Sequence, residues 1–232
     1  MRLILASASP RRRELLAQAG FRFEVKPAHV NEDVRAGEDA IAYVVRLARE
    51  KAETVFDAIV AENAEVVSHP FAKSGRMDGA PRDPSVDEAL VVLGADTTVT
   101  VDGQILGKPA DAADAARMLR LLSGRTHRVI TGVAVVTSPI DVDLSMGALE
   151  RRILRPRVEV AAEVTGVKFA TLREEEIAAY VATGEPMDKA GAYAIQGGAG
   201  KWIPRVEGCY FNVVGLPLAL VTAMLEGVGV RG

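Results

Sequence analysis

The sequence has only one cysteine, Cys209, no run of 18 apolar residues and no excess of positive charge. One cysteine excludes a framework of intramolecular disulfides and is typical of a reducing compartment, so we expect a cytoplasmic protein. The short apolar stretch among the first residues predicts neither a signal peptide nor a membrane span. A net charge of −3 argues against a nucleic-acid-binding surface. We therefore expect neither a membrane nor nucleic acid as a partner.

Cysteine–histidine metal motifs are absent as well. The three histidines are scattered, and none pairs with the cysteine at zinc-ligand spacing. What the sequence does have is an ordinary globular composition, with 49% hydrophobic and 25% charged residues in a chain of 232. That length suits one large domain or two small lobes around a shared core.

Apolar periodicity and turn residues predict strands and helices that alternate without a strict βαβ repeat, which indicates an α/β protein with a mixed sheet. The expected strands are 2–6, 90–109 (a hairpin turning at Asp102–Gly103), 126–138, 158–171, 190–195 and 208–215. The expected helices are 10–20, about 38–60, 112–122, 171–182 and 216–225, the fourth with a Thr171–Glu174 capping box.

Two stretches, about 62–89 and 139–157, break this pattern. The first is polar, with scattered proline and glycine and no period, and the second is similarly irregular. We interpret both as irregular insertions.

Three consecutive arginines, Arg11 to Arg13, open the first predicted helix. Ser9 suits its N-cap and Pro10 its first position, so backbone N–H groups and the positive end of the helix dipole point at the preceding turn. Both a solvated basic face and an anion site fit this pattern. Lys51 lies on the apolar stripe of the second predicted helix, where it either extends to the surface or reaches an anion in a cleft.

A carboxylate, Asp96, interrupts the apolar run "VVLGADTTV" directly after a glycine. Because a buried, unpaired carboxylate is costly, this residue caps a turn, is paired, or lines a cleft at a strand end. Lys108 follows on the return strand of the predicted hairpin, on the same side of the sheet. Glu32 lies in a polar connection and, taken alone, has the pattern of a surface acid.

Together these residues suit a nucleoside triphosphate. The set contains four cations and two carboxylates: Arg11, Arg12, Lys51, Lys108, Glu32 and Asp96. The carboxylates would hold a magnesium ion that bridges phosphate oxygens, and one of them would position or deprotonate the attacking water. Cations crowded into an empty cleft stabilise nothing, so we expect Lys51→Met to leave the melting temperature unchanged or raised.

Several ordered motifs resemble the Maf family over nearly the whole chain outside the two insertions: "LASASPRRRELL", "VNED", "YVVRLAREKA", "LGADTTV", "LGKPAD", "GEPMDKAGAYAIQG" and "YFNVVGLPL". The resemblance implies a single domain over 1–232 with an elongated mixed sheet, flanking helices and two lobes around a cleft, as in inosine-triphosphate pyrophosphatases. It also implies hydrolysis of a nucleoside triphosphate to the monophosphate and pyrophosphate with a divalent metal, Mg²⁺ or Mn²⁺, and a homodimer.

The resemblance further implies roles by position. Ser7, Arg11 and Arg12 match the family's phosphate-binding turn, whereas Arg13 falls at a variable position and is expected in solvent. The implied catalytic cluster is Glu32, Lys51, Asp96 and Lys108, with Asp96 as the water-activating base and Glu32 and Asp96 as metal ligands.

Two further residues, Thr97 and Gln196, resemble the branch of the family that acts on dTTP and UTP rather than the 7-methyl-GTP branch. A glutamine amide offers a donor and an acceptor to a pyrimidine edge; alternatively, Gln196 is a turn residue bonded to backbone. Two other functions stay open. One is a cell-division (septum formation) regulator that acts by binding a partner, and the other is a different Mg²⁺-dependent nucleotide phosphatase.

Overall fold

The computed structural model describes residues 1–68, 89–138 and 156–232, which form one mixed sheet with flanking helices. The strands are β1 (Arg2–Leu5), β2 (Glu24–Val25), β3 (Leu90–Val101), β4 (Gln104–Leu106), β5 (Thr126–Thr137), β6 (Arg157–Lys168) and β7 (Arg205–Glu207). Their order is β2-β1-β3-β5-β6-β7, with β4 paired to β3. β1 runs parallel to β2 and β3, and the other pairs are antiparallel. The expected α/β class with a mixed sheet is confirmed.

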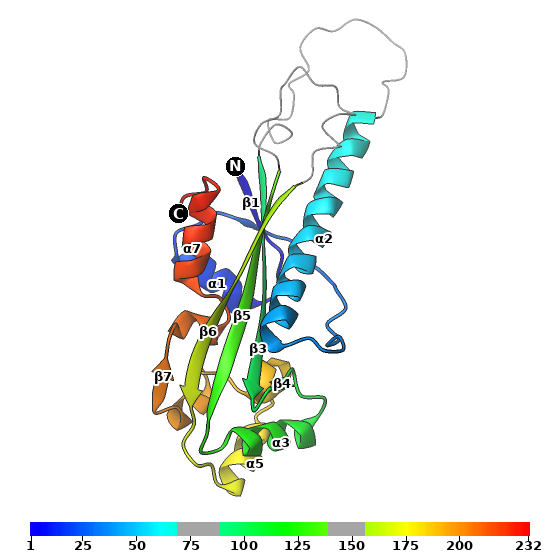
Figure 1. The fold of residues 1–232 in the computed structure, drawn as a ribbon. Helices are drawn as coiled ribbons and strands as arrows, with labels where there is room; N and C mark the ends of the chain where they lie inside the picture. Colours follow the sequence, from blue (N-terminus) through cyan, green and yellow to red (C-terminus); the bar gives the residue numbers. More distant parts are fainter. Residues whose placement is uncertain (69–88, 139–155) are drawn as a thin grey trace, which may run out of the picture.

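The helices flank the sheet on both faces and at one end (Figure 1). They are α1 (Pro10–Gln18), α2 (Ala40–Ser68), α3 (Ala112–Leu122), α5 (Glu174–Ala182), α6 (Tyr210–Val214) and α7 (Leu218–Gly227). α2 runs along one face of β3 and β5, while α1 and α7 cover the other face. Residues of β1 alternate accordingly: Ile4 packs toward α2, and Leu3 and Leu5 pack toward α1 and α7. Among the described residues, no helix combines the length and apolarity that a membrane span needs.

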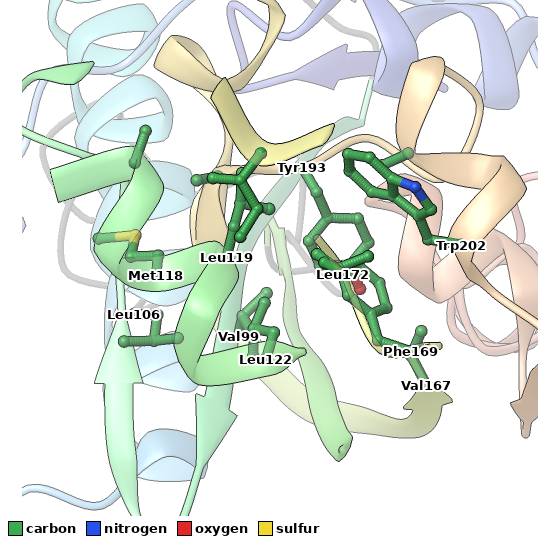
Figure 2. Close-up of a cluster of buried hydrophobic side chains, with 14 of the residues drawn as sticks. Val99, Leu106, Met118, Leu119, Leu122, Val167, Phe169, Leu172, Tyr193 and Trp202 are labelled. Atoms are coloured by element: carbon green, nitrogen blue, oxygen red, sulfur yellow. The ribbon is translucent and has the colours of Figure 1, made fainter. Parts of the chain in front are cut away.

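A separate hydrophobic core builds a second lobe at one end of the long strands, and it includes residues of the strands themselves such as Val99 and Val167. It packs α3 and α5 against short 3₁₀ helices. These are η2 (Glu185–Asp188), η3 (Ala190–Ala192) and η4 (Gly198–Trp202). Figure 2 shows the centre of this core, where Leu119, Phe169, Tyr193 and Trp202 gather. The remaining cores line the two faces of the central sheet and form the first lobe.

The arginine-bearing helix begins where the sequence predicts. The Ser9 hydroxyl accepts a hydrogen bond from the Arg12 backbone N–H at 3.4 Å, and Pro10 is the first residue of α1. The N-terminus of α1, with the positive end of its dipole, therefore follows directly on the turn that leaves β1.

Two glycines let α2 approach the sheet closely. A Cβ added at Gly94 would come within 2.2 Å of the Ala48 carbonyl oxygen, and one at Gly132 within 2.3 Å of the Val44 carbonyl oxygen. Without side chains at these positions, the helix backbone contacts the strands directly. Gly94 precedes Asp96 by two residues in β3, so the contact brings α2 against the part of the sheet that carries this carboxylate.

Two predicted strands are helical instead. Residues 190–195 contain η3, where Gly191 and Ala192 have positive φ values of 69° and 60° that break any extended backbone. Residues 208–215 contain α6, whose buried Asn212 donates hydrogen bonds to β5 and β6. Both predictions are wrong because short apolar runs do not distinguish strand from helix by their period. Two short strands, β2 and β7, were not predicted.

The bounds of the two expected insertions also need correction. α2 continues to Ser68, so the first residues of the stretch at 62–89 are helical, and β6 already begins at Arg157. Residues 69–88 and 139–155 lie outside the described part of the chain.

The predicted capping box at Thr171 is wrong: only its second half forms, two residues later, because the arginine side chain at the N-cap has no acceptor. The Glu176 carboxylate accepts the Arg173 backbone N–H at 3.0 Å, so α5 begins at Glu174 with Arg173 as its N-cap, not Thr171. Arginine is a rare residue at an N-cap, and sequence reasoning passed over it in favour of a threonine.

We expect Gly132→Ala to destabilise the protein by about 1–3 kcal/mol or more, because the new methyl group overlaps the α2 backbone. Urea unfolding followed by circular dichroism measures the change. Gly227→Ala in α7 is the matched control, since an added Cβ there meets nothing within 4 Å. Equal stability of the two variants would contradict the close contact.

Candidate active site

A cleft of about 620 Å³ lies between the two lobes. Its walls come from the turn after β1, the middle of β3, the chain after β4 and the segment that joins η2 to η4. Every site residue predicted from the sequence lines it: Ser7, Arg11, Arg12, Glu32, Lys51, Asp96, Thr97, Lys108 and Gln196. The structure therefore brings the predicted residues together, while the role of each stays a prediction.

The β1–α1 turn supplies the first group of contacts, centred on Arg12. Its Nε donates to the Gly215 carbonyl oxygen at 2.8 Å, and its two terminal nitrogens donate to Thr97 Oγ1 at 2.9 Å and Ser7 Oγ at 3.3 Å. Burial lowers the pKa of Arg12, while the negative charge of Asp96 acts against that shift. An anion in the cleft would likewise favour the charged guanidinium.

The three arginines of the sequence motif separate as expected. Arg11 and Arg12 are half-buried and line the cleft, whereas Arg13 is exposed. Arg11 therefore stands at the cleft beside the N-terminus of α1, and Arg13 is on the solvent side of the helix.

Lys51 forms the charged centre of the cleft. Its Nζ donates to Glu32 Oε1 and to Asp96 Oδ1, each at 2.6 Å. The side chains of Lys51 and Asp96 are only 10% and 12% exposed, while that of Glu32 is 47% exposed. Of the alternatives open from the sequence, Asp96 is a paired carboxylate in the middle of a strand, and Lys51 stays inside between two acids.

Opposing effects set the pKa of Glu32. Burial raises it, but the hydrogen bond and charge of Lys51, with the charges of Lys108 and Arg12, outweigh burial and lower the pKa overall. Glu32 is thus held as a carboxylate. Lys108 itself is exposed at the edge of the cleft, on the chain that follows β4.

Sequence reasoning missed the residues that hold the Glu32 loop. The Tyr43 hydroxyl donates to the Glu32 carbonyl oxygen at 2.8 Å, and an Arg46 terminal nitrogen donates to the Asp33 carbonyl oxygen at 3.0 Å. Arg46 also pairs with Glu38 at 2.6 Å, a hydrogen bond that lowers the pKa of Glu38 to about 2. Their three-residue spacing on α2 was the available signal, because it places Tyr43 and Arg46 on neighbouring turns of one helix face.

Thr97 links the arginine to the sheet and the C-terminal helices. Besides accepting from Arg12, its Oγ1 lies 2.9 Å from Thr131 Oγ1, which in turn donates to the Asn212 carbonyl oxygen at 3.3 Å. This chain of hydroxyl groups fixes the rotamer of Arg12 from behind.

Gln196 lies on the far wall of the cleft, in a turn and not at the strand end that the sequence predicted. Its side chain is exposed and makes no hydrogen bond within the described residues, so the alternative of a backbone-bonded turn glutamine is not realised. The amide is free to meet a ligand.

The donor set suits a divalent cation shared with a substrate. Glu32 and Asp96 approach the same ammonium group, and no group of three histidine, cysteine, aspartate or glutamate residues in the described chain forms a cage of its own. Magnesium is commonly bound by one or two carboxylates with phosphates and waters completing the shell. The two carboxylates fit that mode.

The cleft of this α/β protein presents arginines, lysines and two carboxylates. Such a cleft is typical of proteins that bind a polyphosphate beside acidic groups. The family model for Maf-like protein matches residues 2–228, so this chain belongs to the Maf family. The resemblance found in the motifs is confirmed.

Relatives of the chain carry a common name. It is 46% identical over 230 residues to a dTTP/UTP pyrophosphatase of Koribacter versatilis (strain Ellin345), covering 99% of this chain and 96% of the relative. It is 46% identical over 229 residues to a dTTP/UTP pyrophosphatase of Anaeromyxobacter sp. (strain Fw109-5), covering 98% and 90%. Among solved structures, a nucleoside-triphosphatase / dITP/XTP pyrophosphatase from Mycobacterium abscessus overlaps 99% of this chain and 98% of its own, at 14% identity and a TM-score of 0.37. That identity and that TM-score are too low to support a conclusion about this chain.

The premise behind the expectation for Lys51→Met is wrong, because Lys51 lies between two carboxylates and not among cations. We expect the substitution to lower stability by about 3–5 kcal/mol, since it leaves Asp96 buried without its partner. Thermal and urea unfolding measure the loss. Adding Asp96→Asn in the same chain should recover part of it by removing the unpaired charge.

Lys26→Met serves as the control, because Lys26 pairs with Glu62 at the surface, where an ion pair contributes about 0–1 kcal/mol. An unchanged melting temperature in Lys51→Met would contradict a stabilising role for the charged centre.

Proposed function

We propose that this chain is a nucleoside triphosphate pyrophosphatase that hydrolyses dTTP and UTP to the monophosphate and pyrophosphate. One observation carries the proposal: a single cleft gathers five lysine and arginine residues with three carboxylates, two of which, Glu32 and Asp96, share the ammonium group of Lys51. The relatives named dTTP/UTP pyrophosphatase support it, since the chain matches them over nearly its full length.

In this proposal the triphosphate lies over the N-terminus of α1. Ser7, Arg11 and Arg12 would bind its oxygens at the positive end of the helix dipole. Lys108, at the opposite edge of the cleft, would neutralise a further phosphate oxygen. Because Arg12 is already held by Thr97 and Gly215, it pays little conformational entropy on binding.

The chemical step would use Asp96 as a general base. A water oxygen forms a bond to the α-phosphorus, its proton passes to the Asp96 carboxylate, and the bond to the bridging oxygen breaks so that pyrophosphate leaves with the electron pair. Lys51 holds Asp96 Oδ1 and orients the carboxylate. Glu32 and Asp96 are the residues that would hold Mg²⁺ or Mn²⁺, whose charge neutralises the phosphate oxygens.

Base choice would fall to Gln196. Its unpartnered amide can give one donor and one acceptor, which matches the adjacent carbonyl and N–H of uracil and thymine. Cytosine reverses part of that pattern. Thr97, bonded to Arg12 in the described structure, would support the phosphate side of the cleft.

The proposal includes three further expectations. We expect the chain to form one Maf-like domain over 1–232, to assemble as a homodimer, and to be located in the cytoplasm, where nucleotides are available. A role as a partner-binding regulator of cell division is compatible with catalysis and is separated from it by the Asp96 variant below.

We expect purified protein with Mg²⁺ or Mn²⁺ to release pyrophosphate from dTTP and UTP, and Asp96→Asn to lower kcat by about 10²–10⁴-fold because the general base is lost. Ion chromatography of the products measures this. Asp57→Asn is the control, as Asp57 is exposed on the same helix as Lys51. Release of orthophosphate would identify a different phosphatase, and no hydrolysis at all would overturn the proposal.

We expect Gln196→Leu to lower the ratio of kcat/KM for UTP to kcat/KM for CTP by about tenfold or more, since a site built for hydrogen bonds penalises the wrong pattern through its own unpaired groups. Steady-state kinetics with both nucleotides test this. A ratio that stays at the wild-type value would remove Gln196 from base recognition.

A further inference from the structure

The turn that carries Gln196 is held to the rest of the protein in an unusual way. Residues 193–197 belong to no strand or helix, so no ladder of backbone hydrogen bonds fixes their position. The Gly197 N–H bonds to the Ala194 carbonyl oxygen at 3.1 Å, which closes the turn on itself but does not anchor it. Two of its residues are held by their own side chains, since Tyr193 is buried with its hydroxyl 2.7 Å from His127 Nε2, and Ile195 packs against the core of the first lobe. The side-chain hydrogen bonds to the backbone of the turn come from the second lobe.

Two side chains, Tyr180 from α5 and Glu185 from η2, hold the two ends of this turn. The Ala194 N–H donates to the Tyr180 hydroxyl oxygen at 3.2 Å, and the Gly198 N–H donates to Glu185 Oε1 at 3.1 Å. The Tyr180 hydroxyl in turn donates to Glu185 Oε1 at 2.7 Å. A continuous chain of hydrogen bonds therefore runs from one end of the turn to the other, behind Gln196.

Packing holds the Tyr180 side of the network in place. Tyr180 is buried, and its ring packs edge-on against Trp202 with centroids 5.2 Å apart. Burial first, and then the bond to Glu185, raise the pKa of the Tyr180 hydroxyl, so it stays a donor at neutral pH. A Cβ on Gly197 would lie 1.9 Å from Glu185 Oε1, which shows how closely the carboxylate is pressed against the turn.

We propose that Tyr180 and Glu185 are positioning residues that determine base specificity by fixing the Ala194–Gly198 turn behind Gln196. The inference rests on the proposed function, because it assumes that the Gln196 amide meets the base. Neither residue is among those that line the cleft, so each would act through the turn and not by touching substrate.

The physical reason is the steep distance and angle dependence of hydrogen bonds. An amide that discriminates uracil from cytosine must present its donor and acceptor in one orientation, and a displacement of about 1 Å loses both bonds. The proposed phosphate contacts lie on the other wall, at α1 and β3. Loosening the turn should therefore weaken base discrimination while the reacting phosphate keeps its place.

The test is Tyr180→Phe, which removes one hydroxyl and leaves the ring packing against Trp202. We expect the ratio of kcat/KM for UTP to that for CTP to fall about fivefold to tenfold, mainly through KM, with kcat for UTP nearly unchanged. Tyr210→Phe is the matched control, since Tyr210 is 43% exposed and lies outside the network. The control should keep the wild-type ratio.

Glu185 gives an independent pair of variants. Glu185→Gln retains an oxygen that accepts from Tyr180 and Gly198 and should keep most of the discrimination, whereas Glu185→Leu removes the acceptor and should lose it. A residue with only a structural role would lower the melting temperature without moving the UTP-to-CTP ratio, and that result would overturn the proposal.

A double-mutant cycle separates this inference from the proposed function. If the network acts through Gln196, Tyr180→Phe should not change the ratio further once Gln196→Leu is present. Additive effects would contradict action through Gln196. Failure of the wild-type protein to release pyrophosphate from UTP would overturn the proposed function itself, whereas a selective wild type with an unaltered Tyr180→Phe variant would overturn only the positioning role.

Discussion

The ammonium group of Lys51 is the contact on which the cleft depends, because it joins two carboxylates that reach it from separate parts of the chain. Taking these charges out of water is costly, and the cost is offset only while each one keeps a partner. The geometry in turn depends on glycine, since α2 can lie against β3 only where Gly94 leaves room for its backbone. A steric feature of the sheet thus decides where a charge can be placed. Because the two acids more than balance Lys51, in the proposed function the attraction for a polyphosphate would come from Arg11, Arg12, Lys108 and the N-terminus of α1.

Much of the candidate site could be predicted from the sequence, because polar residues stood out against apolar patterns. Asp96 interrupts a buried strand and Lys51 interrupts the buried stripe of a helix, and each interruption needs a partner or a ligand. The arginines were predictable for a different reason, since a serine N-cap and a proline at the first helical position fix where the helix begins. What no local pattern could give is the pairing itself, as Lys51 and Asp96 are 45 residues apart and meet only when the helix packs on the sheet.

The errors in the sequence analysis have physical causes of the same kind. Residues 190–195 have the composition of a strand, yet Gly191 packs so closely against Val99 that the backbone turns there instead of extending. The stretch around Asn212 was apolar enough for a strand, but a buried amide that donates to two strands needs the projection that a short helix gives it. In both cases tertiary contacts, which a local period does not contain, overrode propensity. Tyr180 and Glu185 escaped notice because, apart from the hydrogen bond between them, their partners are backbone N–H groups, and any residue supplies those.

In the proposed enzyme the two lobes would have different functions, one binding the phosphates and the other the base. The phosphate side of the cleft is built on the central sheet, where β3 and α2 carry the charged centre and the core is continuous across the strands. The base side is built on irregular segments of the second lobe, fixed by side-chain contacts to backbone. Strands with full ladders tolerate little displacement, whereas a turn whose backbone is held by a few side-chain hydrogen bonds can be repositioned by a single substitution. The residues that act on the phosphates, which all nucleoside triphosphates share, would then lie on the sheet, and the residues that select the base would lie on the turn. Base specificity could therefore change while the reacting groups keep their positions.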